Sequence, residues 1–253
     1  MFLKKIAHIV LIMSVAAGVL SCSATAPEIK TSITANTTAN TAANTTNANP
    51  ADLPTRYAEL EKTGGKLFTL DPKSSTVRIF AFRGGKAARL GHNHVLSAPT
   101  FTGFFHLPVE GTTNAQFDLE FRLDQLEIDN PAYRATLGSA FATVVSPESI
   151  AGTREHMLGD DSLQADRFPF VRIHSLQISG EAPKFAAEVR VEMHGQSRNM
   201  WIPLNVEGLP DRLLVSGSFV LRLTDFGVQP YSIMGGLLAV KDEVVIEFQL
   251  VGA

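Results

Sequence analysis

"AQFDLEFRL", residues 115–123, alternates apolar and polar side chains without interruption. Phe117, Leu119, Phe121 and Leu123 occupy every second position of this stretch. The positions between them hold Gln116, Asp118, Glu120 and Arg122. Successive side chains of an extended chain point to opposite faces, so this period of two predicts a strand with one buried and one solvated face.

The same period recurs along the chain after residue 66. It is found in "TVRIFAF" (76–82), "FPFVRIHSLQI" (168–178), "FAAEVRVEM" (185–193), "LLVSGSFVLRL" (213–223) and "EVVIEFQL" (243–250). One helix is expected at 146–158, where Ser146 and Pro147 suit its first positions, and a shorter helical turn at 56–62. With no strand–helix–strand rhythm, the pattern predicts an all-β domain with one or two short helices. It would be an antiparallel barrel of about eight strands or a sandwich.

Residues 1–21 have the layout of an export signal. Two lysines precede an apolar run at 6–20, which is shorter than the roughly 20 residues of a membrane span. The run ends in "VLSC" (19–22), which resembles the bacterial lipobox, and Cys22 is the only cysteine in the chain. We therefore expect lipidation at Cys22, and Ser23 after it favours the outer membrane in chains of this kind; an ordinary secretory signal is the alternative.

Residues 22–65 are predicted to be the lipidated cysteine followed by a disordered tether. Up to about residue 55 the segment is mostly Thr, Ala, Asn and Ser, which cannot bury enough apolar surface to offset the entropy of ordering. A flexible chain of this length reaches on the order of 30 Å. The folded domain is then expected to span 66–253, on the periplasmic side of the cell envelope.

The charge of the chain bounds its partners. It carries 22 Lys and Arg against 25 Asp and Glu, and loss of residues 1–21 removes two of the lysines. No basic tract marks a nucleic-acid footprint, so nucleic acid is not an expected partner. The sequence leaves the oligomeric state open.

Five segments, in order, give the domain a resemblance to the YceI-like family. They are "LFTLDPKSSTVRIFAF" (67–82), "FTGFFHL" (101–107), "REHMLGDDSLQADRFPFVRIHS" (154–175), "VEMHGQSRNMWIPLNV" (191–206) and "GSFVLRLTDFGV" (217–228). The resemblance implies an extended, lipocalin-like antiparallel barrel whose interior is a tunnel for a long isoprenoid or acyl chain. At 83–98 the chain departs from the family pattern with "RGGKAARLGHNHVLSA".

On the basis of this resemblance, we expect a ligand tunnel lined by apolar side chains. The predicted lining is Phe80, Phe82, Phe105, Phe121, Met193, Leu221, Leu223 and Phe226. Alternation alone fits a filled core equally well, because in a small barrel the core face is also the cavity face. His94, His174 and His194 are the predicted polar residues at the tunnel mouth.

"LGHNHVL" (90–96) raises the possibility of a metal site. Two histidines two apart on a strand, His92 and His94, can face one ion. A third ligand would have to come from His106, His156, His174, His194, Asp160 or Asp161, and none is indicated by spacing. We expect instead that this segment starts a strand near the tunnel mouth and holds no metal.

The leading prediction is a binding protein, not an enzyme, with no cofactor. The chain lacks a Gly-x-Ser-x-Gly nucleophile motif, and Ser139 in "LGSAF" has no flanking pair of glycines. The expected partners are a long apolar lipid in the tunnel and a membrane reached through lipidated Cys22. The alternatives are a metal-dependent enzyme or metal-binding protein using His92 and His94, and a structural envelope lipoprotein with a filled core.

Overall fold

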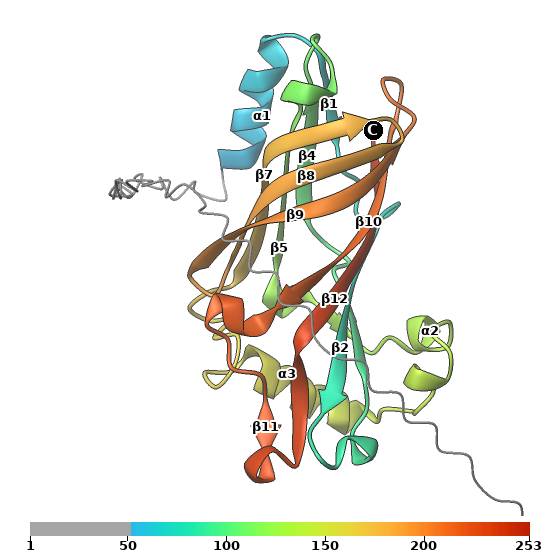
Figure 1. Ribbon diagram of the computed structural model, residues 1–253, viewed down its shortest axis with the longest axis vertical. Coiled ribbons are helices and arrows are strands. Elements are labelled where there is room, and N and C mark those ends of the chain that lie inside the picture. The colour runs from blue at the N-terminus through green and yellow to red at the C-terminus, as the bar shows by residue number, and fades with distance from the viewer. Residues whose placement is uncertain (1–51) are drawn as a thin grey trace, which may run out of the picture. The chain divides into compact units, whose positions relative to one another are not determined.

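The computed structural model describes residues 52–253 (Figure 1). The predicted export signal at 1–21, the lipidation site at Cys22 and the tether up to residue 51 lie outside the described residues. Asn47–Ala253 forms a compact unit by itself. Among the described residues, none of the helices combines the length and the apolar character needed to cross a bilayer.

Strands make up most of the described chain. They are β1 (Lys66–Thr69), β2 (Thr76–Gly84), β3 (His94–Ser97), β4 (Thr102–Leu107), β5 (Gln116–Arg122), β6 (Glu127–Ile128), β7 (Phe170–Glu181), β8 (Lys184–Met193), β9 (Gln196–Glu207), β10 (Leu213–Arg222), β11 (Ser232–Ile233) and β12 (Leu238–Gly252). The helices are α1 (Leu53–Lys62), α2 (Pro131–Arg134) and α3 (Pro147–Leu158). Short 3-10 turns lie at Ala88–Leu90, Thr112–Asn114, Leu123–Gln125, Ser139–Phe141, Leu223–Phe226 and Met234–Gly236.

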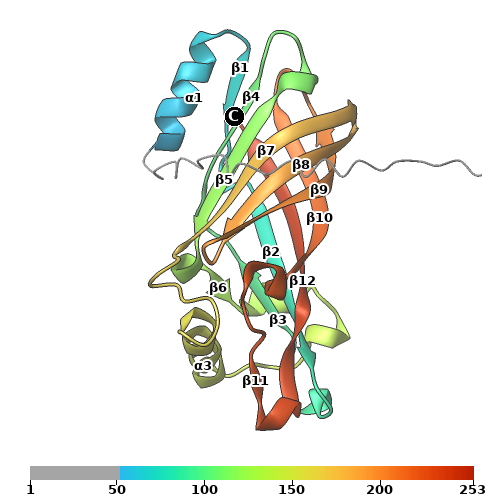
Figure 2. The same ribbon diagram turned by 60° about the vertical axis from the view of Figure 1, so that its left-hand side comes forward.

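The strands form one antiparallel sheet that curls around a common interior (Figures 1 and 2). Its order is β1-β4-β5-β7-β8-β9-β10-β12-β2-β3-β6, and β11 pairs with β12. Thr69 and Ala253 exchange two backbone hydrogen bonds of 3.0 and 3.1 Å, which join the end of β1 to the end of β12. The all-β barrel fold is confirmed. The sheet has 12 strands instead of about eight: β3 and β6 continue its order beyond β2, and β11 pairs with β12 off that order.

The inner face of the sheet holds the main hydrophobic core. Leu119, Phe121 and Leu123 from the β5 region belong to it, so the face predicted from "AQFDLEFRL" is the buried one. Gly217 on β10 lies among these inward positions. A Cβ atom at Gly217 would come within 2.5 Å of the Phe248 ring, so only glycine leaves room for that ring on the neighbouring strand.

Helix α1 packs on the outer face of the sheet, beside β1 and β4 (Figures 1 and 2). Tyr57 is fully buried there, and its ring stacks on Phe104 with centroids 5.1 Å apart. Its hydroxyl donates a 2.6 Å hydrogen bond to Asp118, which Arg56 also contacts. Burial raises the pKa of the Tyr57 hydroxyl, although the Arg56 charge opposes this shift. The hydroxyl therefore keeps its proton and acts as a hydrogen-bond donor. The prediction of a tether that reaches residue 65 is therefore wrong for residues 53–62. Tyr57 anchors a helix there, and this helix is longer than the turn expected at 56–62.

Changing Tyr57 to phenylalanine should lower the free energy of unfolding by about 1.5–3 kcal/mol, the typical value of a hydrogen bond to a charged group. Chemical denaturation measures this loss. Tyr133→Phe is the matched control, because the Tyr133 ring is held by the Arg78 guanidinium, 4.8 Å from its centroid, and phenylalanine keeps that contact. Equal stability of Tyr57→Phe and the wild type would show that α1 is not held through Asp118.

Helix α3 forms where the sequence predicts it. The Ser146 hydroxyl accepts a 3.2 Å hydrogen bond from the backbone N–H of Ser149, and Pro147 takes the first helical position. Arg154 of α3 donates hydrogen bonds to the backbone carbonyls of Asp124 (3.0 Å) and Leu126. These contacts hold α3 against the loop between β5 and β6, at one end of the sheet (Figure 2).

Candidate functional site

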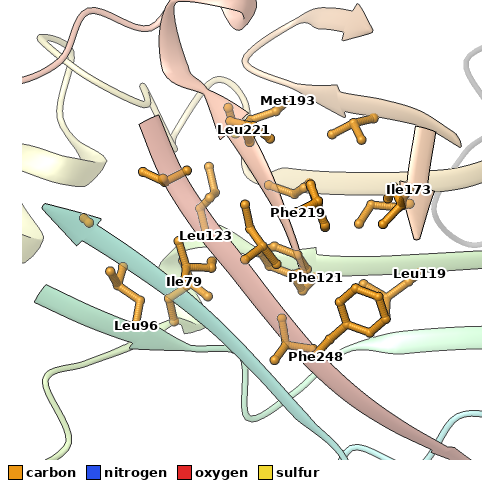
Figure 3. Close-up of a pocket in the computed structure, with 18 of the residues that line it drawn as sticks. Ile79, Leu96, Leu119, Phe121, Leu123, Ile173, Met193, Phe219, Leu221 and Phe248 are labelled. Atoms are coloured by element: carbon orange, nitrogen blue, oxygen red, sulfur yellow. The ribbon is translucent and has the colours of Figure 1, made fainter. Parts of the chain in front are cut away.

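The curled sheet encloses a cavity of about 550 Å³ (Figure 3). Cavities that hold small ligands commonly measure about 300–1,000 Å³. Apolar side chains of β2, β5, β7, β8, β9, β10 and β12 supply most of its lining. Representative residues are Ile79, Leu119, Ile173, Val191, Ile202, Leu221 and Ile246. The interior is therefore not filled by side chains alone.

Phenylalanine rings form the middle of the cavity. Figure 3 shows Phe121, Phe219 and Phe248 pointing toward one another from β5, β10 and β12. The rings of Phe219 and Phe248 lie edge to face, with centroids 6.4 Å apart. Aromatic rings and branched aliphatic groups offer no hydrogen bonds, so this part of the cavity suits hydrocarbon.

The cavity is polar at the end closed by α3. Ser149, Thr153 and His156 of α3 line it, together with Tyr231 and with His92 and His94. The Tyr231 hydroxyl lies 3.2 Å from His156 Nε2, and the two rings stack with centroids 4.5 Å apart. We call these six side chains the polar end. Their hydroxyl and imidazole groups can donate and accept hydrogen bonds.

His94 is fixed from behind by a buried ion pair. Its Nδ1 lies 2.6 Å from the carboxylate of Asp129, which is almost fully buried. Arg134 donates to the same carboxylate at 2.5 Å, and the N–H of Val95 donates to it at 3.0 Å. Burial would raise the pKa of Asp129, but the hydrogen bonds from His94, Val95 and Arg134 outweigh it and lower the pKa.

His92 stands beside His94, with ring centroids 5.5 Å apart. Burial, followed by the neighbouring His94 and Arg134 charges, lowers the pKa of His92. The side chain of Asn93 between them points away: it accepts from the Arg83 N–H at 3.0 Å and donates to the Ala140 carbonyl at 3.1 Å. β3 begins at His94, so "LGHNHVL" leads into a strand as predicted.

A metal site at His92 and His94 finds no third ligand in the structure. Within residues 52–253, His, Cys, Asp and Glu side chains do not gather in any group of three or more suited to an ion. The Nδ1 of His94 is instead hydrogen-bonded to the carboxylate of Asp129. That the domain holds no metal stays a prediction.

The structure divides the predicted tunnel residues into two groups. Phe105, Phe121, Met193, Leu221 and Leu223 line the cavity. Phe80, Phe82 and Phe226 are not among its lining residues. Phe226 is fully buried in the core beside it.

For Phe80 and Phe82, the structure corrects the face assignment of β2. Val77, Ile79 and Ala81 take the inner positions of the strand. Phe80 packs on the other face, edge to face with Phe141 at 5.8 Å between centroids, and Phe82 packs against the same cluster. Both faces of β2 are covered by other parts of the protein. The large rings of Phe80 and Phe82 therefore did not show which face of the strand lines the cavity.

The three histidines predicted at one mouth lie in three separate places. Only His94 lines the cavity. His174 is on the outer face of β7, where its Nδ1 lies 2.9 Å from Asp118 below α1, and burial, followed by the Arg56 and Arg190 charges, lowers its pKa. The Nδ1 of His194 donates a 3.0 Å hydrogen bond to the backbone carbonyl of Phe226.

Sequence reasoning did not place Ser149, Thr153, His156 and Tyr231 in the site. The sequence does contain a signal for Ser149, Thr153 and His156. Their spacing of four and three residues puts them on one face of the predicted helix. Tyr231 had no such signal, since it follows a turn and meets His156 only in the folded chain.

Comparisons with known proteins agree with this architecture. A family model described as YceI-like domain matches residues 68–252. The crystal structure of Burkholderia cenocepacia BcnA has a TM-score of 0.53 and 15% identity, covering 72% of this chain and 98% of that chain.

Two further solved structures are similar to the chain. That of a polyisoprenoid binding domain from Saccharophagus degradans, implicated in plant cell wall breakdown, has a TM-score of 0.48 and 14% identity, covering 74% of this chain and 98% of that one. That of the Campylobacter jejuni YCEI protein has a TM-score of 0.44 and 10% identity, covering 62% and 82%. No curated protein matches the chain. At 15% identity, the likeness to the BcnA structure speaks for the fold alone.

Proposed function

Because the chain belongs to the YceI-like domain family, we propose that it binds one long apolar lipid chain, isoprenoid or acyl, inside the barrel. The observation that carries this proposal is the cavity of about 550 Å³, lined by apolar side chains from strands all around the sheet. Such a lining offers a hydrocarbon tail the same removal from water that a protein core offers its own side chains.

The binding energy of such a ligand comes from burial of its tail. Each buried methylene contributes about 0.8 kcal/mol, so a tail of roughly ten methylenes contributes about 8 kcal/mol. This sum is comparable with the estimated cost of lost translational and rotational freedom, about 4–15 kcal/mol. A tail that fills the cavity is therefore required for tight binding, and shorter molecules bind weakly.

The head of the ligand belongs at the polar end. Four side chains at this end line the cavity and combine a ring with hydrogen-bonding atoms: His92, His94, His156 and Tyr231. This arrangement replaces the predicted mouth, since His174 and His194 do not face the cavity. The role proposed for the polar end is to bind the head of the ligand.

The proposed setting is the periplasm, with the protein anchored by lipid at Cys22 in the outer membrane, as the sequence predicts. This part of the proposal rests on the sequence of residues 1–23. Mass spectrometry of the mature N-terminus tests it, because a lipidated cysteine adds the mass of its acyl groups. An unmodified N-terminus would refute the anchor and leave the proposed cavity function untouched.

Native mass spectrometry of the purified protein, followed by organic extraction, tests lipid binding directly. We expect a co-purified apolar molecule at about one per protein chain. Val215→Trp should abolish its retention, because Val215 lines the cavity and the larger side chain takes the space of the tail.

Val220→Trp is the matched control for Val215→Trp. Val220 lies on the same strand but is 56% exposed on the outer face. This variant should keep its lipid at the wild-type level. A wild-type protein that carries no apolar molecule and takes up none when mixed with lipid would refute the proposed function.

A further inference from the structure

One end of the described domain presents apolar side chains to solvent on two adjacent turns. The first turn follows β2 and contains Leu90, which is 70% exposed. The second joins β11 to β12 and contains Met234, 75% exposed, with Ile233 and Leu237 beside it, 37% and 39% exposed. We call residues 85–91 and 233–237 the tip. Figures 1 and 2 both show these turns at the end of the domain away from α1.

Backbone contacts hold the two turns together. The N–H of Ala87 donates a 2.8 Å hydrogen bond to the Leu237 carbonyl. Gly85, at φ +85°, approaches so closely that a Cβ atom there would lie 2.5 Å from the same carbonyl oxygen. The strands behind the turns pair as well, with Ala239 opposite Gly84. The tip is therefore one surface built from two distant parts of the sequence.

The two sequence segments that form and flank the tip carry charges of a single sign. Residues 83–91 and 228–241 contain Arg83, Lys86, Arg89 and Lys241, and neither segment contains Asp or Glu. Lys86, Arg89 and Lys241 are exposed. The whole chain has a formal net charge of −3, so the positive charge is local to this end. Asp242, the next residue along β12, is engaged by Arg222 and Thr224.

The tip adjoins the polar end of the cavity. His92 directly follows its first turn, and Tyr231 lies two residues before its second. Both line the cavity, as does Val240, whose N–H donates 2.8 Å to the Tyr231 carbonyl. A surface on which the tip rests would thus lie next to the end where the head of a ligand is held.

We propose that the tip docks on the surface of a membrane that contains anionic lipids. Apolar side chains on exposed turns lose contact with water when they enter the interfacial region, and nearby Lys and Arg side chains are attracted to anionic headgroups. A second copy of the chain is a poorer occupant, because a self-complementary contact would bring the cations of the two tips together. The proposal stands on this surface alone and does not require lipid in the cavity.

Vesicle flotation tests the docking with a chain that begins at Ser23. This chain lacks Cys22 and the preceding apolar run, and it retains the compact unit Asn47–Ala253. Vesicles of phosphatidylethanolamine and phosphatidylglycerol should carry it upward, and vesicles of phosphatidylcholine alone should carry much less. Raising the salt concentration should weaken the binding, because salt screens the attraction to the headgroups.

Met234→Glu should weaken binding to the anionic vesicles at least about tenfold, since it replaces an inserted apolar group by a negative charge. Val109→Glu is the matched control: Val109 is 78% exposed but lies in the turn after β4, and its change should alter binding less than about twofold. Lys86→Ala combined with Arg89→Ala should weaken binding to the anionic vesicles about tenfold or more. Thermal unfolding checks that each variant is folded, and native mass spectrometry follows its lipid content separately.

Three results would overturn the docking proposal. The first is a wild-type chain that does not float with anionic vesicles. The second is an equal effect of Met234→Glu and Val109→Glu. The third is a concentration-dependent doubling of mass in solution that Met234→Glu abolishes, which would assign the tip to a contact between copies. None of these results bears on whether the cavity holds lipid.

Discussion

Replacing Phe121 with aspartate is expected to empty the cavity and to destabilise the domain strongly. Phe121 is 7% exposed, lies on β5, and points into the middle of the cavity beside Phe219 and Phe248 (Figure 3). Loss of a buried phenylalanine ring alone costs about 3–5 kcal/mol. The new carboxylate adds a further cost, because the apolar wall offers it no partner. We expect unfolding at much lower denaturant concentration and no co-purified lipid in the folded fraction.

Phe82→Asp is the matched control and also tests the corrected face of β2. Phe82 is partly buried against Phe80 and Phe141, outside the cavity lining. The variant should lose stability but retain lipid, provided that it is purified folded. A Phe121→Asp protein with wild-type stability and lipid content would contradict the assignment of β5. Loss of lipid from a folded Phe82→Asp protein would restore Phe82 to the tunnel.

The fold was predictable because alternation is a local property of the sequence. On β5 the two faces differ clearly, with Phe and Leu at one set of positions and Asp, Glu and Arg at the other. On β2 both faces are apolar, so the period of two predicted the strand but not its orientation. Orientation there is decided by partners far away in sequence: Phe141 covers Phe80 from outside, and Ile246 of β12 stands opposite Ile79.

The polar contacts were less predictable because they join distant positions. His174 is explained only by Asp118, which is 56 residues away and also receives Tyr57 of α1. A histidine on a strand gives no local sign of which carboxylate it will meet. In the same way, His94 resembled a metal ligand in sequence, whereas its Nδ1 faces Asp129, 35 residues later. The six residues of the polar end come from three segments that only the closed barrel brings together.

Asp129→Ala is expected to destabilise the domain by about 3–5 kcal/mol at pH 7, the cost of leaving a buried charge without its partner. Asp129 is 1% exposed and Arg134 is 6% exposed, so the remaining guanidinium could not recover its lost interaction from water. The N–H of Val95 and Nδ1 of His94 would lose their acceptor as well. Asp124→Ala is the control, since Asp124 pairs with Arg122 at the surface and such pairs contribute about 0–1 kcal/mol.

The pH dependence of this difference identifies the carboxylate as its cause. The pKa of Asp129 in the folded protein is lowered, and in the unfolded chain it is close to the ordinary value of about 3.9. The unfolded state therefore takes up the proton first as the pH falls, and the stability that the carboxylate contributes is present above about pH 4 and is lost as the pH falls through the folded pKa. Denaturation of both proteins at neutral pH and below pH 4 should show the gap between wild type and Asp129→Ala narrowing in acid. A gap of constant size would mean that Asp129 acts through packing, and the ion pair behind His94 would then not be what fixes the polar end of the cavity.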